Sequence, residues 1–291
     1  MKKKIVTKVE CVFLFCWISS EKALRRGSLV DHSVALFFFF SFFFRRMDEF
    51  TRAAIQRGKE NPSWVPLESN PDALTGFARG IGMPDTVAFV DCFGLDAELL
   101  GFLPAPVYGF VLLYPCDNEK IAAGRREAKH AADAGEVECF WMEQSIGNAC
   151  GTIAVVHALL NNRDRIALKP DSLLARYGQI GQGLSPADRG YLLGGWNEIK
   201  EVHVEAAVHC ESNQTSAPAA EDNVNNHFVA FACVGDRVVE FDGCKQSHIV
   251  HGKTTQATFA VDCAKTIQEK YFELDPNANF SIIVLAAAPN E

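Results

Sequence analysis

One stretch decides the fold: Gln144–Leu160, which reads QSIGNACGTIAVVHALL. From Cys150 onward it is apolar on nearly every face of a helix, so we expect a helix that is buried in the core. Asn148 is of a residue type that caps helix N-termini, which places Cys150 in the first turn. There the unpaired backbone N–H groups and the helix dipole favour a thiolate. Cys150 is therefore a candidate nucleophile, although a cysteine at a helix start is more often a packing residue.

The histidine that could serve Cys150 has to come from elsewhere in the chain. His157 lies seven helical residues away, roughly 10 Å along the axis, so we interpret it as a core residue or a support behind the site. The better candidate is His227, which opens an apolar stretch that is typical of a central strand and ends at Val234. Gln144 lies six residues before Cys150, where its amide could join the Cys150 backbone N–H in holding an oxyanion.

A hairpin turn fixes the neighbours of His227. Gly235-Asp236 is a two-residue turn, after which Arg237–Asp242 returns as the second strand. Counting back from the turn, His227 faces Cys244 and is a diagonal neighbour of Asp242 on the same side of the sheet. Such diagonals are about 7–8 Å apart at Cα, within reach of an imidazole–carboxylate hydrogen bond. Asp242 is therefore the candidate that orients His227, the alternative being two polar side chains at a strand end that simply meet solvent.

The same register places Cys244 beside His227 on this face. One hypothesis is that Cys244 tunes the pKa of the site or makes it sensitive to oxidation. The alternative is that Cys244 is a neutral small residue.

Composition and charge narrow the class of protein. Of the 291 residues, 48% are hydrophobic and 22% charged, as in a globular protein. Residues 1–46 hold nine Lys/Arg and three Asp/Glu, which leaves nineteen against thirty-three, or −14, for the rest. This acidic body argues against nucleic acid as a partner. The ten cysteines form no C-x-x-C pair and no zinc-type cluster, so we expect no metal or other cofactor, no disulfide framework and a cytoplasmic protein.

Residues 1–46 differ from the rest of the chain. They hold two apolar runs, Cys11–Ile18 and Val34–Phe44, and neither is long enough to span a bilayer. We interpret the segment as an extension outside the domain, either an artefact of gene modelling upstream of Met47 or a targeting segment. Residues 47–291 are predicted to form one domain.

The body of the chain mixes helices and strands, which predicts a single α/β or α+β domain. A helix is predicted to begin at Asn70-Pro71 and another at Ser185-Pro186, and residues 117–136 read as a surface excursion. Strands are predicted at 86–90, 107–114, 137–142 and 280–285. Before the last strand, apolar residues recur every four positions, as in a helix: Phe259, Cys263, Ile267 and Tyr271.

Assembled in order, these motifs resemble the ubiquitin C-terminal hydrolase family, peptidase family C12, and most of all its small cytosolic isozymes. The nucleophile signature is Gln144-x3-Asn148-Ala149-Cys150, the base strand begins at Asn226-His227-Phe228, and Glu240-Phe241-Asp242-Gly243 matches the orienting turn. The stretch Trp64–Pro71 resembles the part of the family that contacts ubiquitin. Two residues depart from the family pattern: Cys244 stands in place of an Arg, and Glu143 in place of a Lys.

The resemblance implies a papain-like fold, an antiparallel-centred sheet flanked by helices on both sides, with a knotted backbone. It implies Cys150, His227 and Asp242 as the triad and Gln144 as the oxyanion donor. The substrate-binding candidates are Trp64, Leu67, Glu68, Asn148 and Asp222, with Asp91 as a further acidic residue for the arginines of the ubiquitin tail. Residues 208–225 form a long polar loop, equivalent to one that crosses over the active site in this family.

These features predict a monomeric deubiquitinating cysteine protease. It would hydrolyse amide, ester and thioester bonds at the C-terminal glycine of ubiquitin, favour small or flexible leaving groups, and take NEDD8 as a possible second modifier. Two alternatives stay open: a ubiquitin-binding protein that shelters free ubiquitin with little turnover, and a form tethered to a membrane by residues 1–46.

Overall fold

The computed structural model describes residues 49–60, 63–220, 222 and 224–289. The chain divides into two units, Met1–Phe50 and Thr51–Glu291, and the features below belong to the second. The predictions for residues 1–46 and for a domain boundary at Met47 lie outside the described residues. Within those ranges, no helix combines the length and the apolar character that crossing a bilayer requires.

A six-stranded sheet, in which every neighbouring pair is antiparallel, forms the centre of this unit. The order across the sheet is β1-β6-β2-β3-β4-β5, so the strand that carries His227 lies near the middle. The strands are β1 (Val87–Asp91), β2 (Val107–Pro115), β3 (Asn226–Val234), β4 (Arg237–Phe241), β5 (Ile249–Lys253) and β6 (Ser281–Ala287). Three of the predicted strands are confirmed as β1, β2 and β6, with small shifts at their ends.

The strand predicted at 137–142 is wrong. These residues run next to α6 (Cys150–Leu160) without joining a sheet. Two side chains of the α6 region bind the backbone of this segment instead. The Phe140 N–H donates to Asn161 Oδ1 at 2.8 Å, and the Met142 N–H donates to His157 Nε2 at 3.0 Å. The apolar residues of this segment are typical of a buried strand. Their backbone N–H groups, however, are satisfied by side chains and not by the hydrogen bonds of a neighbouring strand.

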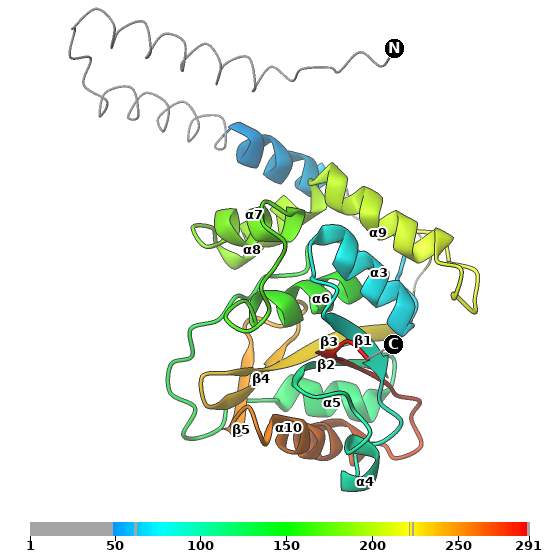
Figure 1. Cartoon of the computed structure of the whole chain (residues 1–291), viewed down its shortest axis with the longest axis vertical. Helices are drawn as coiled ribbons and strands as arrows, with labels where there is room; N and C mark the ends of the chain where they lie inside the picture. Colours follow the sequence, from blue (N-terminus) through cyan, green and yellow to red (C-terminus); the bar gives the residue numbers. More distant parts are fainter. Residues whose placement is uncertain (1–48, 61–62, 221, 223, 290–291) are drawn as a thin grey trace, which may run out of the picture. The chain divides into compact units, whose positions relative to one another are not determined.

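Helices cover both faces of the sheet (Figure 1). One face carries α3 (Pro71–Ile81), α6, α7 (Leu173–Gly181), α8 (Pro186–Gly194) and α9 (Asn197–His209). The other carries α4 (Ala97–Leu100), α5 (Glu119–Glu127), α10 (Phe259–Ile267) and the π-helical turn η1 (Gln268–Phe272). This arrangement confirms the predicted antiparallel-centred sheet with helices on both sides.

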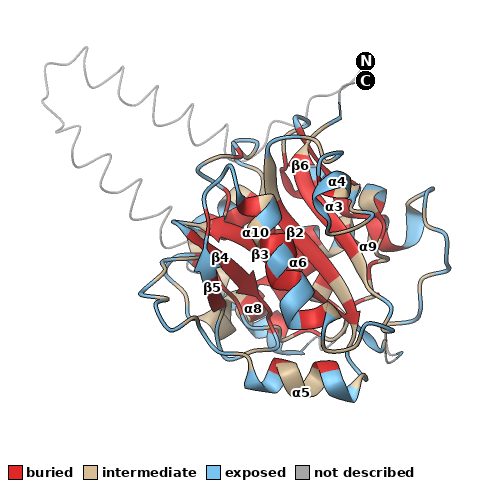
Figure 2. Cartoon of the chain, turned by 90° about the horizontal axis from the view of Figure 1, so that it is seen from below, coloured by how far each residue is buried: buried red, intermediate tan, exposed pale blue. Residues whose placement is uncertain are grey.

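The α6 helix is a deeply buried element, as its sequence predicts. Every residue from Gly151 to Leu160 is buried, and the helix packs directly on β2 and β3. The central strands on which it packs are largely buried as well (Figure 2). Within α6, only Cys150, at its first position, is partly exposed. A rigid, fully packed helix therefore presents one reactive side chain at its N-terminal end.

Local sequence signals explain most helix boundaries. Asn70 Oδ1 accepts from the N–H groups of Asp72 and Ala73 and starts α3, and Ser185 Oγ caps α8 in a similar way. All four residues of the predicted four-residue repeat are fully buried, from Phe259 through Tyr271. The predicted surface excursion at 117–136 instead contains α5, which Asn118 caps and which buries Ile121 and Arg125.

Candidate active site

Cys150 is the first residue of α6, as predicted, but Asn148 does not cap this helix. The N-cap is Ala149, without a side-chain hydrogen bond. Asn148 has a positive φ of 60°, a left-handed conformation that Asn tolerates better than most residues. Its amide points at the loop instead, and donates to the carbonyls of Ala220 at 3.1 Å and Asp222 at 3.0 Å. The first backbone N–H groups of α6 thus receive no side-chain cap.

The predicted hairpin register is confirmed. Val234 pairs with Arg237 across the turn, and the ladder continues to Ala230 opposite Phe241. Just beyond it, the His227 Nε2–H donates to Asp242 Oδ1 at 2.8 Å, and both residues are buried. Interaction with the Cys150 thiol is one of the effects that raise the pKa of this imidazole, which places the sulfur near the ring. The structure therefore brings Cys150, His227 and Asp242 into one array.

Opposing effects set the protonation of this pair. Burial alone would raise the pKa of Asp242, but the hydrogen bond from His227 and the positive charges of His227 and Arg125 hold this pKa well below its usual value. Burial alone would lower the pKa of His227, yet its bonds to Asp242 and to the thiols of Cys150 and Cys244 raise that pKa well above normal. The arrangement favours an imidazolium held between a carboxylate and a sulfur.

A buried ionic cluster lies behind Asp242, and no pattern in the sequence predicts it. Arg125 of α5 is 4% exposed; its guanidinium forms an ion pair with Glu240 and lies 3.3 Å from Asp242 Oδ2. Glu240 is completely buried and also accepts from His251 Nε2 at 3.0 Å and the Tyr271 hydroxyl at 3.2 Å. In a charged, Ala-rich stretch an arginine looks like a surface residue, so only the fold reveals this role.

Gln144 is held against the turn that follows Asp242. Its backbone N–H donates to the Gly243 carbonyl at 2.8 Å. A Cβ on Gly243 would come within 3.0 Å of Gln144 Cβ, so glycine allows the close approach. The Gln144 Oε1 atom is buried with no hydrogen-bond partner among the described residues. Its part in catalysis stays a prediction.

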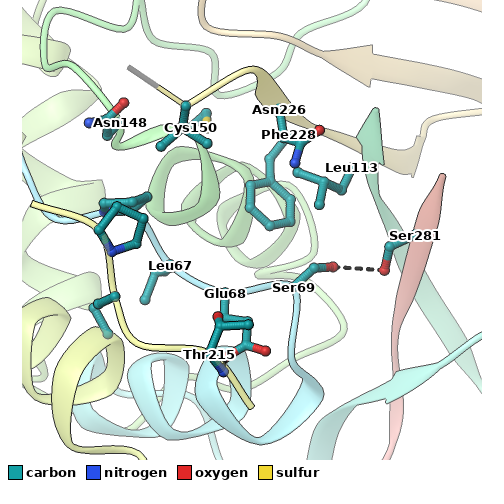
Figure 3. A pocket seen from close by; sticks show the side chains of 15 residues that line it. Leu67, Glu68, Ser69, Leu113, Asn148, Cys150, Thr215, Asn226, Phe228 and Ser281 are labelled. Atoms are coloured by element: carbon teal, nitrogen blue, oxygen red, sulfur yellow. Dashed lines mark hydrogen bonds between the residues drawn. The ribbon is translucent and has the colours of Figure 1, made fainter. Parts of the chain in front are cut away.

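A cavity of about 350 Å³ opens beside Cys150 (Figure 3). Leu67 and Phe228 form its apolar side, and Gly151 approaches both so closely that a Cβ there would lie 3.3 Å from each. The loop before β3 contributes Thr215, Ala217, Pro218 and Val224 to the lining. An extended chain end could enter this cavity and reach the sulfur.

The predicted substrate-binding residues have different surroundings. Leu67 lines the cavity, whereas Trp64 is 1% exposed and packs on His203 with ring centroids 4.7 Å apart. In this conformation the Trp64 side chain cannot touch a partner directly. Asp91 is exposed at the end of β1 and lines a separate hollow. The substrate-binding roles of all these residues stay predictions.

The long loop is fastened at two points, one of which is two residues before Cys150. At one end the Glu68 carboxylate accepts from the N–H groups of Gln214 at 3.0 Å and Thr215 at 3.4 Å. At the other end Asn148 holds the carbonyls of Ala220 and Asp222. We call this pair of contacts, at Glu68 and Asn148, the loop latch.

Cys244 lies beside His227, as the register predicts. One donor atom each from His227, Asp242 and Cys244 lies within 4.8 Å of the other two, and the Cys244 N–H donates to Asp242 Oδ1 at 2.9 Å. Among the described residues these three could offer ligands to a metal ion, but the bonds within the array already employ the same atoms. The expectation that the protein needs no metal stays a prediction.

A cysteine at the start of a helix, facing an imidazole that a carboxylate orients, defines the site of a thiol hydrolase. Residues 64–272 match the family described as ubiquitin carboxyl-terminal hydrolase, family 1, and this chain belongs to that family.

Individual relatives agree with this assignment. The chain is 35% identical to a ubiquitin carboxyl-terminal hydrolase of Aplysia californica over 73% of this chain and 96% of that protein. It is 34% identical to ubiquitin carboxyl-terminal hydrolase 3 of Arabidopsis thaliana over 80% of this chain and 98% of that protein. With isozyme L1 of Homo sapiens it shares 30% identity over 77% of this chain and 98% of that protein.

A solved structure shares the fold. The catalytic domain of Trichinella spiralis UCH37, crystallised with ubiquitin vinyl methyl ester, superposes with a TM-score of 0.61 at 21% sequence identity. The match covers 80% of this chain and 100% of that domain. At this identity the likeness supports the fold alone.

Proposed function

We propose that this protein is a deubiquitinating cysteine protease that hydrolyses amide, ester and thioester bonds at the C-terminal glycine of ubiquitin. The supporting observation is the array of Cys150, His227 and Asp242, with a 2.8 Å bond between the last two, in a chain of this family. The bond between His227 and Asp242 orients the imidazole before a substrate binds.

In the proposed mechanism, the Cys150 thiolate attacks the carbonyl carbon of the terminal glycine. The Cys150 backbone N–H and the Gln144 amide stabilise the oxyanion. His227 then gives its proton to the leaving group, and afterwards takes one from the water that hydrolyses the thioester. Asp242 keeps the imidazole in the tautomer that presents its other nitrogen to the sulfur.

The test is release of a fluorogenic amide from the C-terminus of ubiquitin by wild type and Cys150→Ala, with Cys116→Ala as the matched control. Cys116 is an exposed thiol just after the end of β2, where it lies outside the array. We expect turnover in wild type and the control and none in Cys150→Ala. Tight ubiquitin binding without turnover in the wild type would instead favour the alternative function, in which this protein binds and shelters free ubiquitin.

The loop latch supports a second part of the proposal, that small or flexible leaving groups are preferred. Because the loop is fastened at both of these points, we expect that a leaving group has to pass beneath it or wait for the latch to open. A short peptide passes easily, and a folded domain does not.

The charge of the molecule supports ubiquitin as the partner, because the ubiquitin tail contains arginines and the body of this chain is acidic. Competition between ubiquitin and NEDD8 for the same fluorogenic reaction would show whether NEDD8 is a second modifier. A cytoplasmic location and a monomeric state stay predictions.

A further inference from the structure

Residues 51–60 are helical, and the proposed mechanism does not use them. We call this segment the 51–60 helix; it lies before the residues that match the family, 64–272. Its buried face carries Ala54 and Gly58, which are four positions apart and therefore neighbours on one side of the helix. Residues this small let another backbone approach the helix closely.

The 51–60 helix packs on the corner where α8 ends and α9 begins. A Cβ on Gly58 would overlap the Tyr191 carbonyl oxygen, and a Cβ on Gly195 would overlap the Ala54 carbonyl oxygen. Glycine at both positions therefore permits this close approach of the two backbones. Arg57 also holds the corner, because its Nε–H and Nη2–H groups donate to the Gly195 carbonyl at 3.1 Å and 2.9 Å.

The same corner contacts the segment that leads to the nucleophile. A Cβ on Gly194 would lie 2.9 Å from Ile146 Cδ1 and 3.4 Å from Gly58 Cα, so Gly194 lies between these two residues. Ile146 is 1% exposed and lies four residues before Cys150. A close-packed interior has few voids that could absorb a shift, so a displacement of the 51–60 helix should reach Ile146.

The α8 helix also contacts both neighbours of Gln144. The Glu143 N–H donates to the Pro186 carbonyl at 3.1 Å. A Cβ on Gly190 would lie 3.1 Å from Ser145 Oγ. The proposed oxyanion donor thus lies between two contacts with one helix, and the end of that helix packs on the 51–60 helix.

We propose that the 51–60 helix positions the Gln144 amide for oxyanion stabilisation, which makes Gly58 a positioning residue that acts through α8. This inference rests on the proposed function, in which Gln144 is the oxyanion donor. The contacts run from Gly58 through Gly194 to Ile146, and through α8 to the neighbours of Gln144. Because an oxyanion donor acts at hydrogen-bond distance, a small displacement of its amide lowers the rate of acyl transfer.

A displacement of Gln144 should lower kcat without changing the reactivity of the thiolate. Cys150 begins α6, which packs on β2 and β3, and the hydrogen bond between His227 and Asp242 lies in the hairpin region. The thiolate and its base are therefore held by other contacts. The rate of Cys150 alkylation should stay unchanged, whereas a general loss of structure would alter it together with kcat.

The experiment measures release of a fluorogenic amide from ubiquitin by full-length Gly58→Ala, Gln144→Ala and the double variant. The added methyl group would overlap the Tyr191 carbonyl, so the 51–60 helix has to move. We expect Gly58→Ala to lower kcat about tenfold at unchanged KM, and Gln144→Ala to lower it about 10²–10³-fold. In the Gln144→Ala background, Gly58→Ala should change kcat less than about twofold, because the amide through which it acts is absent.

Gly76→Ala is the matched control and should behave as the wild type does. Gly76 is an exposed glycine of α3, and a Cβ there would meet nothing within 4 Å. Arg57→Ala is a second, milder variant that decides the question if Gly58→Ala does not fold. It removes only the two hydrogen bonds to Gly195, and it should lower kcat in the wild type but not in Gln144→Ala.

Hydrogen exchange at the Gln144 N–H, which donates to the Gly243 carbonyl at 2.8 Å, detects the same coupling without turnover. It should be faster in Gly58→Ala than in Gly76→Ala. An unchanged kcat in folded Gly58→Ala, or an equal loss in both backgrounds, would overturn the proposal. A wild type without turnover would refute the proposed function; equal exchange in the two glycine variants would then also refute the coupling of the 51–60 helix to Gln144.

Discussion

The Arg125 guanidinium lies 3.3 Å from Asp242 Oδ2, while Asp242 Oδ1 accepts the hydrogen bond of His227 at 2.8 Å. The two oxygens of one carboxylate thus connect the catalytic imidazole to a buried cation on a different element. Arg125 also pairs with Glu240, so the same guanidinium balances two buried negative charges. The geometry of the site therefore depends on α5, which has no residue in the array itself.

Replacement of Arg125 by Met should destabilise the protein strongly. It leaves two buried carboxylates without their common counter-ion, and breaking a buried ion pair in this way costs about 3–5 kcal/mol. Arg126→Met is the control, since the Arg126 side chain is 67% exposed, and such a change should cost less than about 0.5 kcal/mol. Urea unfolding measures both. Equal free energies of unfolding for the two variants would show that the cluster does not contribute to the stability of the protein.

Asp242→Asn tests the orienting role with almost no change in shape. Loss of the charge removes the Asp242 charge effect that helps to raise the pKa of His227, so this pKa should fall and less of the imidazolium should remain at neutral pH. We expect kcat to fall by up to about 10⁴-fold, the loss that this change causes in a serine-protease triad. The control is Asp236→Asn, an exposed aspartate in the turn of the same hairpin. The pH dependence of the rate of Cys150 alkylation measures this change directly. An unchanged profile would contradict the orienting role of Asp242.

Opening the loop latch should broaden the range of leaving groups. Asn148→Gly removes both hydrogen bonds to the loop, and glycine adopts the positive φ of this position without strain. Combined with Glu68→Ala, it should raise kcat/KM for a folded ubiquitin–protein conjugate relative to a short ubiquitin extension. Glu211→Ala, an exposed change in the same loop region, is the control. An unchanged ratio of the two kcat/KM values would contradict the leaving-group proposal.

His203 should make the protein less stable in mild acid. Burial lowers its pKa to about 4, and its neutral ring accepts from the Thr152 hydroxyl and donates to the Val65 carbonyl, both at 2.6 Å. In the unfolded chain its pKa is about 6.5. Between these values the unfolded state binds more protons, so this contribution to stability falls as the pH drops from about 6.5 to about 4 and levels off below.

The measurement is the free energy of unfolding of wild type and His203→Gln at pH 7 and pH 4.5. The wild type should lose on the order of 2–3 kcal/mol more than the variant, since each pKa unit corresponds to about 1.4 kcal/mol. The exposed His209→Gln is the control and should follow the wild type. A loss of stability that is the same in all three proteins would show that His203 is not the titrating group.

The sequence predicts the parts of this molecule that local rules control. A two-residue turn determines the register of β3 and β4, and that register alone places His227 beside Asp242 and Cys244. The unbroken apolar character of α6 likewise predicts its burial. These inferences need only the period of a strand or helix.

Contacts between distant segments could not be predicted in this way. Arg125 is buried because it pairs with Glu240 and Asp242 across the fold, which no feature of its own stretch indicates. Asn148 is of a residue type that caps helices, but the loop more than seventy residues later accepts the hydrogen bonds of its amide instead. Residues 137–142 look like a strand because they are apolar, and only the contacts of their backbone with His157 and Asn161 show why they are not.

The central claim is that Cys150 is the nucleophile that attacks the C-terminus of ubiquitin. The most direct measurement is intact-mass and peptide mass spectrometry after incubation with ubiquitin vinyl methyl ester. We expect one ubiquitin adduct, located on Cys150, absent in Cys150→Ala and formed more slowly in His227→Asn. An adduct on Cys116 or Cys244, or none at all in a folded wild-type protein, would contradict the claim.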